Sequence, residues 1–148
     1  MKSYISVLAM PDITNHMGFV HGGELVKIMD NTAGIAAARF CGGNVVTAHM
    51  ETDFKEKVEL GDYITSEAEV VFTGRTSLVC HVILCTENLR TKELKKAAEG
   101  YFIMVAINED GKPRAIEKLC ELHSPDADKA KKIYIRQLQI SHGESTEN

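Results

Sequence analysis

The stretch "NHMGFVHGGELVKIMDNTAGIAAARF", residues 15–40, decides the fold class of this chain. From residue 22 onward, apolar side chains recur around most of a helical circumference and leave only a narrow polar stripe. Gly22-Gly23 stands at the start of this pattern and Gly42-Gly43 follows it, so we expect a helix over residues 22–40. A helix this apolar, with an alanine-rich second half, is expected to be wrapped by a β-sheet.

Most of the other apolar segments have residue patterns typical of β-strands. A short strand is expected over residues 2–10, and longer strand-rich runs occupy residues 44–58, 63–72, 76–87 and 95–108. The last run closes at an Asp110-Gly111 turn. One long helix with about five strands indicates an α+β fold.

The run 44–58 alternates along its length, which predicts two faces. Met50, Thr52 and Phe54 fall on one face, and His49, Glu51 and Asp53 fall on the other. Near the end of the chain, Ser124-Pro125 is expected to cap a second helix. The residues of that helix expected to face the body are Ala130, Ile133 and Leu138.

Composition describes one ordinary domain able to bury a core. The 148 residues are 44% apolar and 26% charged, and we expect a main domain over residues 1–120 with a C-terminal helix and polar tail over 121–148. The net charge of −4 argues against a nucleic-acid binder. Without a signal-like or membrane-spanning apolar run, and with four cysteines that form no CxxC, the sequence predicts a cytoplasmic protein with reduced thiols.

Asp30 is the most unusual residue of the first helix. It falls outside the polar stripe, and its helical neighbours Val26, Ala33, Gly34 and Ala37 are apolar or small. Its carboxylate is therefore expected either at the edge of a dry groove or, as an exposed acid, in a pair with Lys27. Periodicity alone leaves both interpretations open.

The two glycines suggest a second chemical role at the start of the helix. A helix N-terminus offers free backbone N–H groups and partial positive charge, and glycine lets a ligand approach the main chain. Gly22 and Asp30 are eight residues apart, about 12 Å along one helix. If both act on one substrate, the amide and the acid must come from different subunits of a dimer. The simpler alternative is that the glycines only permit a tight turn.

A resemblance to a known family is carried by residues 15–40 and by the segments "VVTAHMETDFKEKVELGDYI", "TGRTSL" and "DGKPRAI". In these segments the chain resembles the hotdog-fold acyl-CoA thioesterases, specifically the YciA and brain acyl-CoA hydrolase group. The resemblance runs from about Tyr4 to about Leu119. It implies a curved antiparallel sheet wrapped around one long central helix, and two subunits that join their sheets into a homodimer. Such dimers commonly assemble into hexamers. It also implies that the chain hydrolyses acyl-CoA to CoA and a carboxylic acid without a metal or other cofactor.

The resemblance also implies a role for each matching residue. Asp30 is similar to the family's catalytic carboxylate, which activates water or attacks the thioester directly. Asn15 is similar to the asparagine that positions the water or the thioester from the neighbouring subunit. Gly22 or Gly23 is similar to the residue at the helix start whose backbone amide polarises the thioester oxygen. The loop expected to receive CoA comprises Gly74, Arg75, Thr76 and Ser77.

Other candidates carry weaker signals. Lys112 and Arg114 are expected either to reach the 3′-phosphate of CoA or to be exposed turn charges. The face formed by His49, Glu51 and Asp53 is better interpreted as solvated than as a metal site. His16 is a candidate base only in the rival hydration reaction described next.

Two rival functions remain at this level. One is hydration or dehydration of an acyl thioester, in which a histidine base and a helix acid lie fourteen residues apart, as His16 and Asp30 do. The absence of prolines around the glycines and the better overall match to the thioesterases argue against it. The other is a non-catalytic acyl-CoA-sensing domain, which the retention of Asn15 and Asp30 disfavours.

Overall fold

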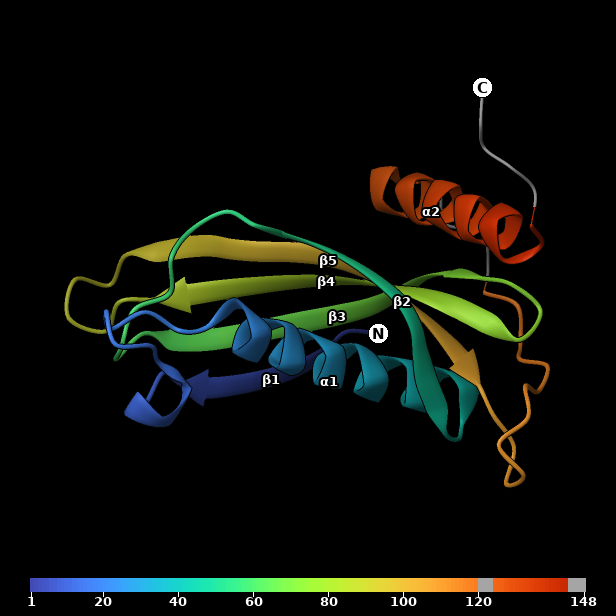
Figure 1. Cartoon of the computed structure of the whole chain (residues 1–148), viewed down its shortest axis with the longest axis horizontal. Coiled ribbons are helices and arrows are strands. Elements are labelled where there is room, and N and C mark those ends of the chain that lie inside the picture. Colours follow the sequence, from blue (N-terminus) through green and yellow to red (C-terminus); the bar gives the residue numbers. More distant parts are fainter. Residues whose placement is uncertain (120–123, 144–148) are drawn as a thin grey trace.

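The computed structural model describes residues 1–119 and 124–143 and shows five antiparallel strands that wrap a long helix (Figure 1). The strands are β1 (Ser3–Leu8), β2 (Val45–Phe54), β3 (Tyr63–Thr73), β4 (Ser77–Glu87) and β5 (Leu94–Ala106). They form one sheet in the order β1-β3-β4-β5-β2. Among the described residues, β1 and β2 are therefore the two edge strands, since β1 pairs only with β3 and β2 pairs only with β5.

The central helix α1 (Gly22–Cys41) lies against one face of the sheet. It buries Leu25, Met29, Thr32, Ala33, Ala36 and Ala37, which confirms the prediction of a sheet-wrapped helix. The small alanines allow β3 and β4 to approach closely. Gly42 ends the helix with φ of 70°, a left-handed conformation that glycine adopts without steric cost.

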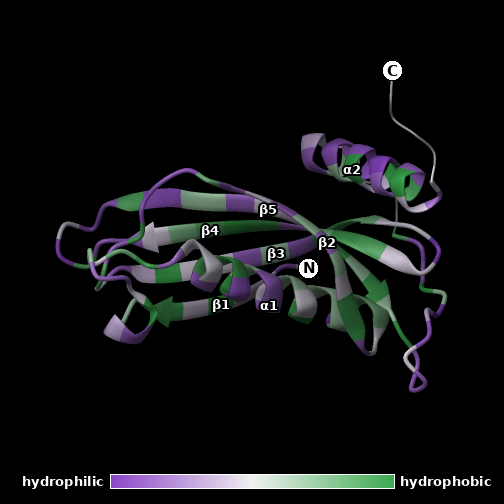
Figure 2. Cartoon of the chain, in the orientation of Figure 1, coloured by the Kyte–Doolittle hydropathy of each residue, from purple (hydrophilic) through white to green (hydrophobic). Residues whose placement is uncertain are grey.

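A second helix, α2 (Pro125–Ser141), packs on the opposite face of the sheet. Ser124 caps it by accepting a hydrogen bond from the Ala127 amide at 3.1 Å. Ala130 and Ile133 are buried as predicted, whereas Leu138 is 39% exposed. Hydrophobic residues dominate β4, which both helices cover, while α2 mixes hydrophobic and hydrophilic residues (Figure 2).

Several expectations can be compared directly with these elements. The alternation of β2 is confirmed from His49 to Phe54, because Met50 pairs with Phe102 on the α1 face and His49 pairs with Ile103 on the α2 face. Cys41, Cys80 and Cys85 are free thiols, as expected. Cys120, the predicted boundary at residue 120 and the end of the polar tail lie outside the described residues. Among the helices of residues 1–119 and 124–143, none is long and apolar enough to cross a membrane.

Candidate active site

Asp30 and Thr47 form the central contact of the candidate site. Asp30 lies in the third turn of α1 and is half-buried, and Thr47 lies near the start of the edge strand β2. The Thr47 hydroxyl donates a hydrogen bond of 2.6 Å to Asp30 Oδ1. This bond holds the carboxylate against the sheet edge, so the hydrogen-bond partner of Asp30 comes from strand β2.

A β-bulge explains how Thr47 reaches the helix. The pairing of β2 with β5 shifts register between Thr47 and His49, which makes Ala48 an extra residue. Strict alternation would place Thr47 on the α2 face together with His49. The bulge instead turns it toward α1, and the sequence analysis missed Thr47 for this reason.

The start of α1 offers unused backbone donors. His21 is the N-cap residue, and its side chain makes no capping hydrogen bond. Its carbonyl accepts from Glu24 and Leu25, but no hydrogen bond of the described residues uses the amides of Gly22 or Gly23. A Cβ at position 22 would lie 3.4 Å from the Phe54 ring, while position 23 has open space around it. The two amides are therefore available to an oxygen of a ligand.

Asn15 lies in the loop that leads to α1, and its side-chain oxygen is committed to that loop. Asn15 Oδ1 accepts from the amides of Met17 at 2.9 Å and Phe19 at 3.1 Å. The Nδ2 group makes no hydrogen bond within the part of the chain that the structure describes. An ordered asparagine with a free donor suits the positioning of a water or a carbonyl oxygen.

Asn15 and Gly22 line one groove of about 720 Å³, whose other wall includes Phe54, Lys55 and Lys57. Asp30 is not part of its lining. The Gly22 amide and the Asp30 carboxylate remain about 12 Å apart along one rigid helix. One subunit therefore brings together Asn15 with Gly22 and, separately, Asp30 with Thr47, but not all four.

The predicted CoA loop is the turn between β3 and β4, and α2 covers one side of it. The Gly74 amide donates to the Ser77 carbonyl at 2.7 Å, which closes the turn. The Ser77 hydroxyl donates to the Tyr134 hydroxyl at 3.2 Å. Arg75 is exposed and Thr76 half-buried. The turn therefore leaves Arg75 available as a cation.

The two basic residues of the "DGKPRAI" segment differ in their surroundings. Lys112 is exposed. Arg114 Nη2 donates to the Cys41 carbonyl at 2.8 Å, at the last turn of α1, and the guanidinium fills the space beside Gly43. Arg114 therefore stabilises the end of the helix, where a cation is favourable.

The polar face of β2 carries a hydrogen-bonded histidine and an ion pair, which share Glu51. His49 Nε2 lies 3.2 Å from Glu51, and Glu51 is also paired with Arg136 of α2. Burial, followed by the nearby Arg136 charge, lowers the pKa of His49. Because Glu51 is already paired with the Arg136 guanidinium, this face matches the predicted solvated surface better than a metal site.

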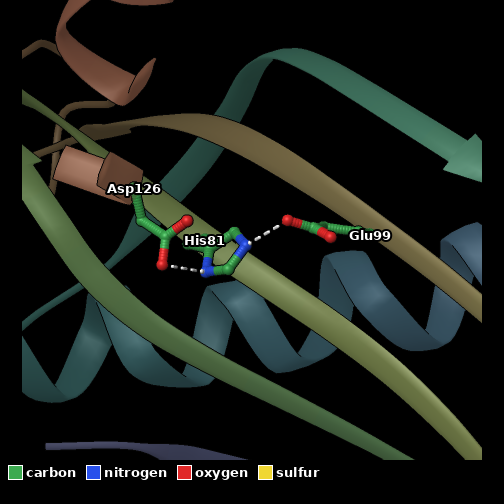
Figure 3. Close-up of side chains that lie close together, drawn as sticks. All are labelled: His81, Glu99 and Asp126. Carbon is green, nitrogen blue, oxygen red and sulfur yellow. Dashed lines mark hydrogen bonds and ion pairs between the residues drawn. The ribbon is translucent and has the colours of Figure 1, made fainter. Parts of the chain in front are cut away.

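A cluster that the sequence analysis missed lies between the sheet and the start of α2 (Figure 3). His81 Nε2 lies 2.9 Å from Glu99, and His81 Nδ1 lies 3.6 Å from Asp126. Burial would raise the pKa of Glu99, but hydrogen bonds from Lys96 and His81 outweigh it and lower the pKa to about 2. Both ring nitrogens face carboxylates and Lys96 pairs with Glu99, so the groups form an ion-pair network that joins α2 to the sheet.

The curved sheet around α1 defines a hotdog fold, and known proteins with this fold agree with the sequence pattern. The thioesterase superfamily model matches residues 17–93, and the chain belongs to this superfamily. An uncharacterised acyl-CoA thioester hydrolase of Zymomonas mobilis is 38% identical over 128 residues, which cover 84% of this chain and 86% of the relative.

Two further comparisons extend this result. A cytosolic acyl coenzyme A thioester hydrolase of Mus musculus is 36% identical over 121 residues, which cover 80% of this chain and 32% of the relative. The chain thus spans about a third of the length of the mouse protein. The crystal structure of an apo-hexameric acyl-CoA thioesterase matches with a TM-score of 0.84 and 28% identity, covering 99% of this chain and 94% of that one.

Proposed function

We propose that the chain hydrolyses acyl-CoA thioesters to free CoA and a carboxylic acid. The observation that carries this proposal is the Asp30 carboxylate, held at an open sheet edge by Thr47 in a chain of the thioesterase superfamily. The names of the mouse and Zymomonas relatives support the same reaction. A carboxylate can serve either as a general base toward water or as a nucleophile toward the thioester carbon.

The proposed site is shared between two subunits. Asp30 and Thr47 of one subunit face the start of α1 in the partner, where the Gly22 and Gly23 amides polarise the thioester oxygen. The Asn15 amide, beside those glycines, positions the water or the thioester. This division follows from the separation of about 12 Å between Gly22 and Asp30 on one helix.

The edge strand β2 is the proposed dimer interface. Within the part of the chain that the structure describes, β2 pairs with β5 on one side only, and two apolar side chains along it, Met50 and Phe54, are 40% and 52% exposed. An unpaired edge with apolar side chains favours pairing with a second strand, and a two-fold axis there joins the two sheets. The hexameric state of the matching crystal structure supports a hexamer of three such dimers.

CoA is proposed to lie along the β3–β4 turn, over Gly74, Arg75, Thr76 and Ser77. Arg75 supplies a charged donor for a phosphate. Of the two further cations proposed for the 3′-phosphate, Lys112 is exposed whereas Arg114 already bonds to Cys41. The reaction needs no metal or other cofactor, because water, a carboxylate and backbone amides suffice. The cytosolic mouse relative supports a cytoplasmic location.

The test is thiol release from a panel of acyl-CoA esters of increasing chain length, with wild type and Asp30→Asn. We expect hydrolysis by the wild type and a turnover at least about 100-fold lower in the variant, with CoA binding retained. Near-normal turnover of Asp30→Asn, or no hydrolysis of any ester by a folded wild type that binds CoA, would end the assignment. The second result would favour an acyl-CoA sensor.

A further inference from the structure

Tyr134 of α2 lies directly against the β3–β4 turn. Its hydroxyl accepts a hydrogen bond of 3.2 Å from Ser77, and its ring lies 5.0 Å from the Phe72 ring, centroid to centroid. Tyr134 is half-buried, while Ser77 is buried. One side chain of the C-terminal helix therefore contacts both ends of the turn.

The same contact explains the glycine at position 74. A Cβ built on Gly74 would overlap the Tyr134 hydroxyl and lie 2.6 Å from Tyr134 Cζ. Gly74 does not have a left-handed backbone conformation, since its φ is not among the positive values of this chain. A side chain at position 74 would therefore have to displace the Tyr134 ring, which accounts for the glycine without a ligand at the same place.

The position of Tyr134 is set by the sheet rather than by the turn. Ala130, one turn before Tyr134 on α2, and Ile133, the residue directly before it, are buried in an apolar cluster with Val71, Val79, Tyr101 and Ile103. At the start of the helix, the Tyr101 hydroxyl donates to Asp126 at 3.2 Å, and His81 lies beside the same carboxylate (Figure 3). Apolar burial and polar contacts together fix the helix, so the ring of Tyr134 arrives at the turn already oriented.

On the other side of the turn, backbone hydrogen bonds complete the support. The Arg75 carbonyl accepts from Ile116 at 3.0 Å, and the Thr76 carbonyl accepts from Ala106 at 2.9 Å. The main chain of the turn is held from both sides, while the Arg75 side chain projects into solvent. This is the arrangement needed to present a cation at low cost in conformational entropy.

We propose that Tyr134 is a positioning residue for CoA. Through Tyr134, α2 holds the β3–β4 turn in place, and this turn presents Arg75 to the phosphates of the substrate. This inference rests on the proposed function and assigns a role in substrate binding to α2, which lies outside the segment matched by the superfamily model. The tyrosine does not touch the reacting atoms. Its effect is on CoA affinity, and the chemical step at Asp30 is unaffected.

The experiment measures kcat and KM for one acyl-CoA ester, the calorimetric Kd for CoA, and the melting temperature. Tyr134→Phe removes the hydroxyl and keeps the ring, and Tyr134→Leu removes both. Tyr63→Phe is the matched control, because Tyr63 begins β3 at the end opposite to the turn and is 39% exposed. We expect Tyr134→Phe to raise KM and Kd roughly threefold to tenfold, the effect of one hydrogen bond, with kcat within about twofold of wild type. Tyr134→Leu raises KM and Kd further, and the control Tyr63→Phe leaves KM and Kd unchanged.

A double-mutant cycle tests the account of Gly74. Gly74→Ala alone displaces Tyr134 and raises KM, but Gly74→Ala combined with Tyr134→Leu should have no higher KM than Tyr134→Leu alone. Fully additive effects would mean that CoA needs the glycine itself, and would overturn that account. Wild-type KM and Kd in both Tyr134 variants, or a fall in kcat at unchanged Kd, would overturn the positioning role. A wild type that binds CoA without hydrolysing any ester would instead count against the proposed function, and the Kd values would still decide the role of Tyr134.

Discussion

The Thr47 hydroxyl lies 2.6 Å from Asp30 Oδ1 and donates a hydrogen bond to it, which joins the central helix to the edge strand at the candidate site. A threonine in this position fixes the direction of the carboxylate and leaves its second oxygen for water or substrate. The two residues come from different elements, and only the β-bulge at Ala48 brings them together.

Replacing Thr47 tests this relationship. We expect Thr47→Val to lower kcat about fivefold with little change in KM, because a net hydrogen bond of about 1 kcal/mol is lost while the side-chain shape is kept. Thr47→Ser, which retains the donor, should recover most of the activity. Thr65→Val, on β3, serves as a control. Equal losses of activity in Thr47→Ser and Thr47→Val would show that the hydroxyl is not the relevant group.

His16 distinguishes hydrolysis from hydration. The residue is exposed in the loop next to Asn15, and we expect His16→Ala to change thioester hydrolysis less than about threefold, since exposed side chains outside the reaction contribute little. The assay compares thiol release with the loss of enoyl-CoA absorbance. Hydration by the wild type, with a loss in His16→Ala as large as in Asp30→Asn, would favour the hydratase.

Arg114 is expected to act mainly on stability. Arg114→Ala removes the donor to the Cys41 carbonyl, and we expect it to lower the free energy of unfolding by about 1 to 2 kcal/mol in urea titrations. Its KM should stay within about twofold of wild type. The exposed Lys112 offers the matched comparison: Lys112→Ala should leave stability unchanged. If Arg114→Ala abolished the preference for an acyl-CoA over the same ester lacking the 3′-phosphate, Arg114 would be a phosphate ligand after all.

The Glu99 cluster predicts a dependence of stability on pH. The pKa of Glu99 is lowered to about 2 in the folded state from its ordinary value of 4.5, so its contribution to stability is complete above about pH 4.5 and is lost as the pH falls toward 2. We expect wild type to be more stable than Glu99→Gln by about 1 kcal/mol at pH 6, after allowance for solvent screening, and the difference to shrink by pH 3. Glu93→Gln, at an exposed position, is the control. A difference that stays constant between pH 6 and pH 3 would contradict this assignment.

The sequence predicted the helix and the strand runs correctly, because both depend on local periodicity, whereas periodicity alone left two surroundings open for Asp30. It could not predict Thr47, because a single extra residue at the bulge reverses the face that strict alternation assigns. The His81 cluster was also missed, since its members are distant in sequence and meet only when α2 docks on the sheet.

Gly74 illustrates a second limit of prediction from the sequence. Its place in the "TGRTSL" segment suggested contact with CoA, whereas the structure places the Tyr134 hydroxyl beside it. A glycine in a sequence shows that space is needed, but it does not show which group fills that space. The predicted roles of Gly74, Arg75, Thr76 and Ser77 in CoA binding remain predictions, now with a neighbour that can be varied independently.

The most direct test of the central claim is to mix two inactive variants, Asn15→Ala and Asp30→Asn, and to measure thioester hydrolysis after subunit exchange. If one subunit supplies Asn15 and the helix-start amides to the Asp30 of its partner, each hybrid dimer carries one intact site. About half of randomly mixed dimers are hybrids, so roughly a quarter of wild-type activity should return, provided that the sites act independently. Native mass spectrometry confirms that hybrids form. Hybrids that form and stay at the parental level of activity would show that Asn15 and Asp30 act within one subunit, and would contradict the shared site.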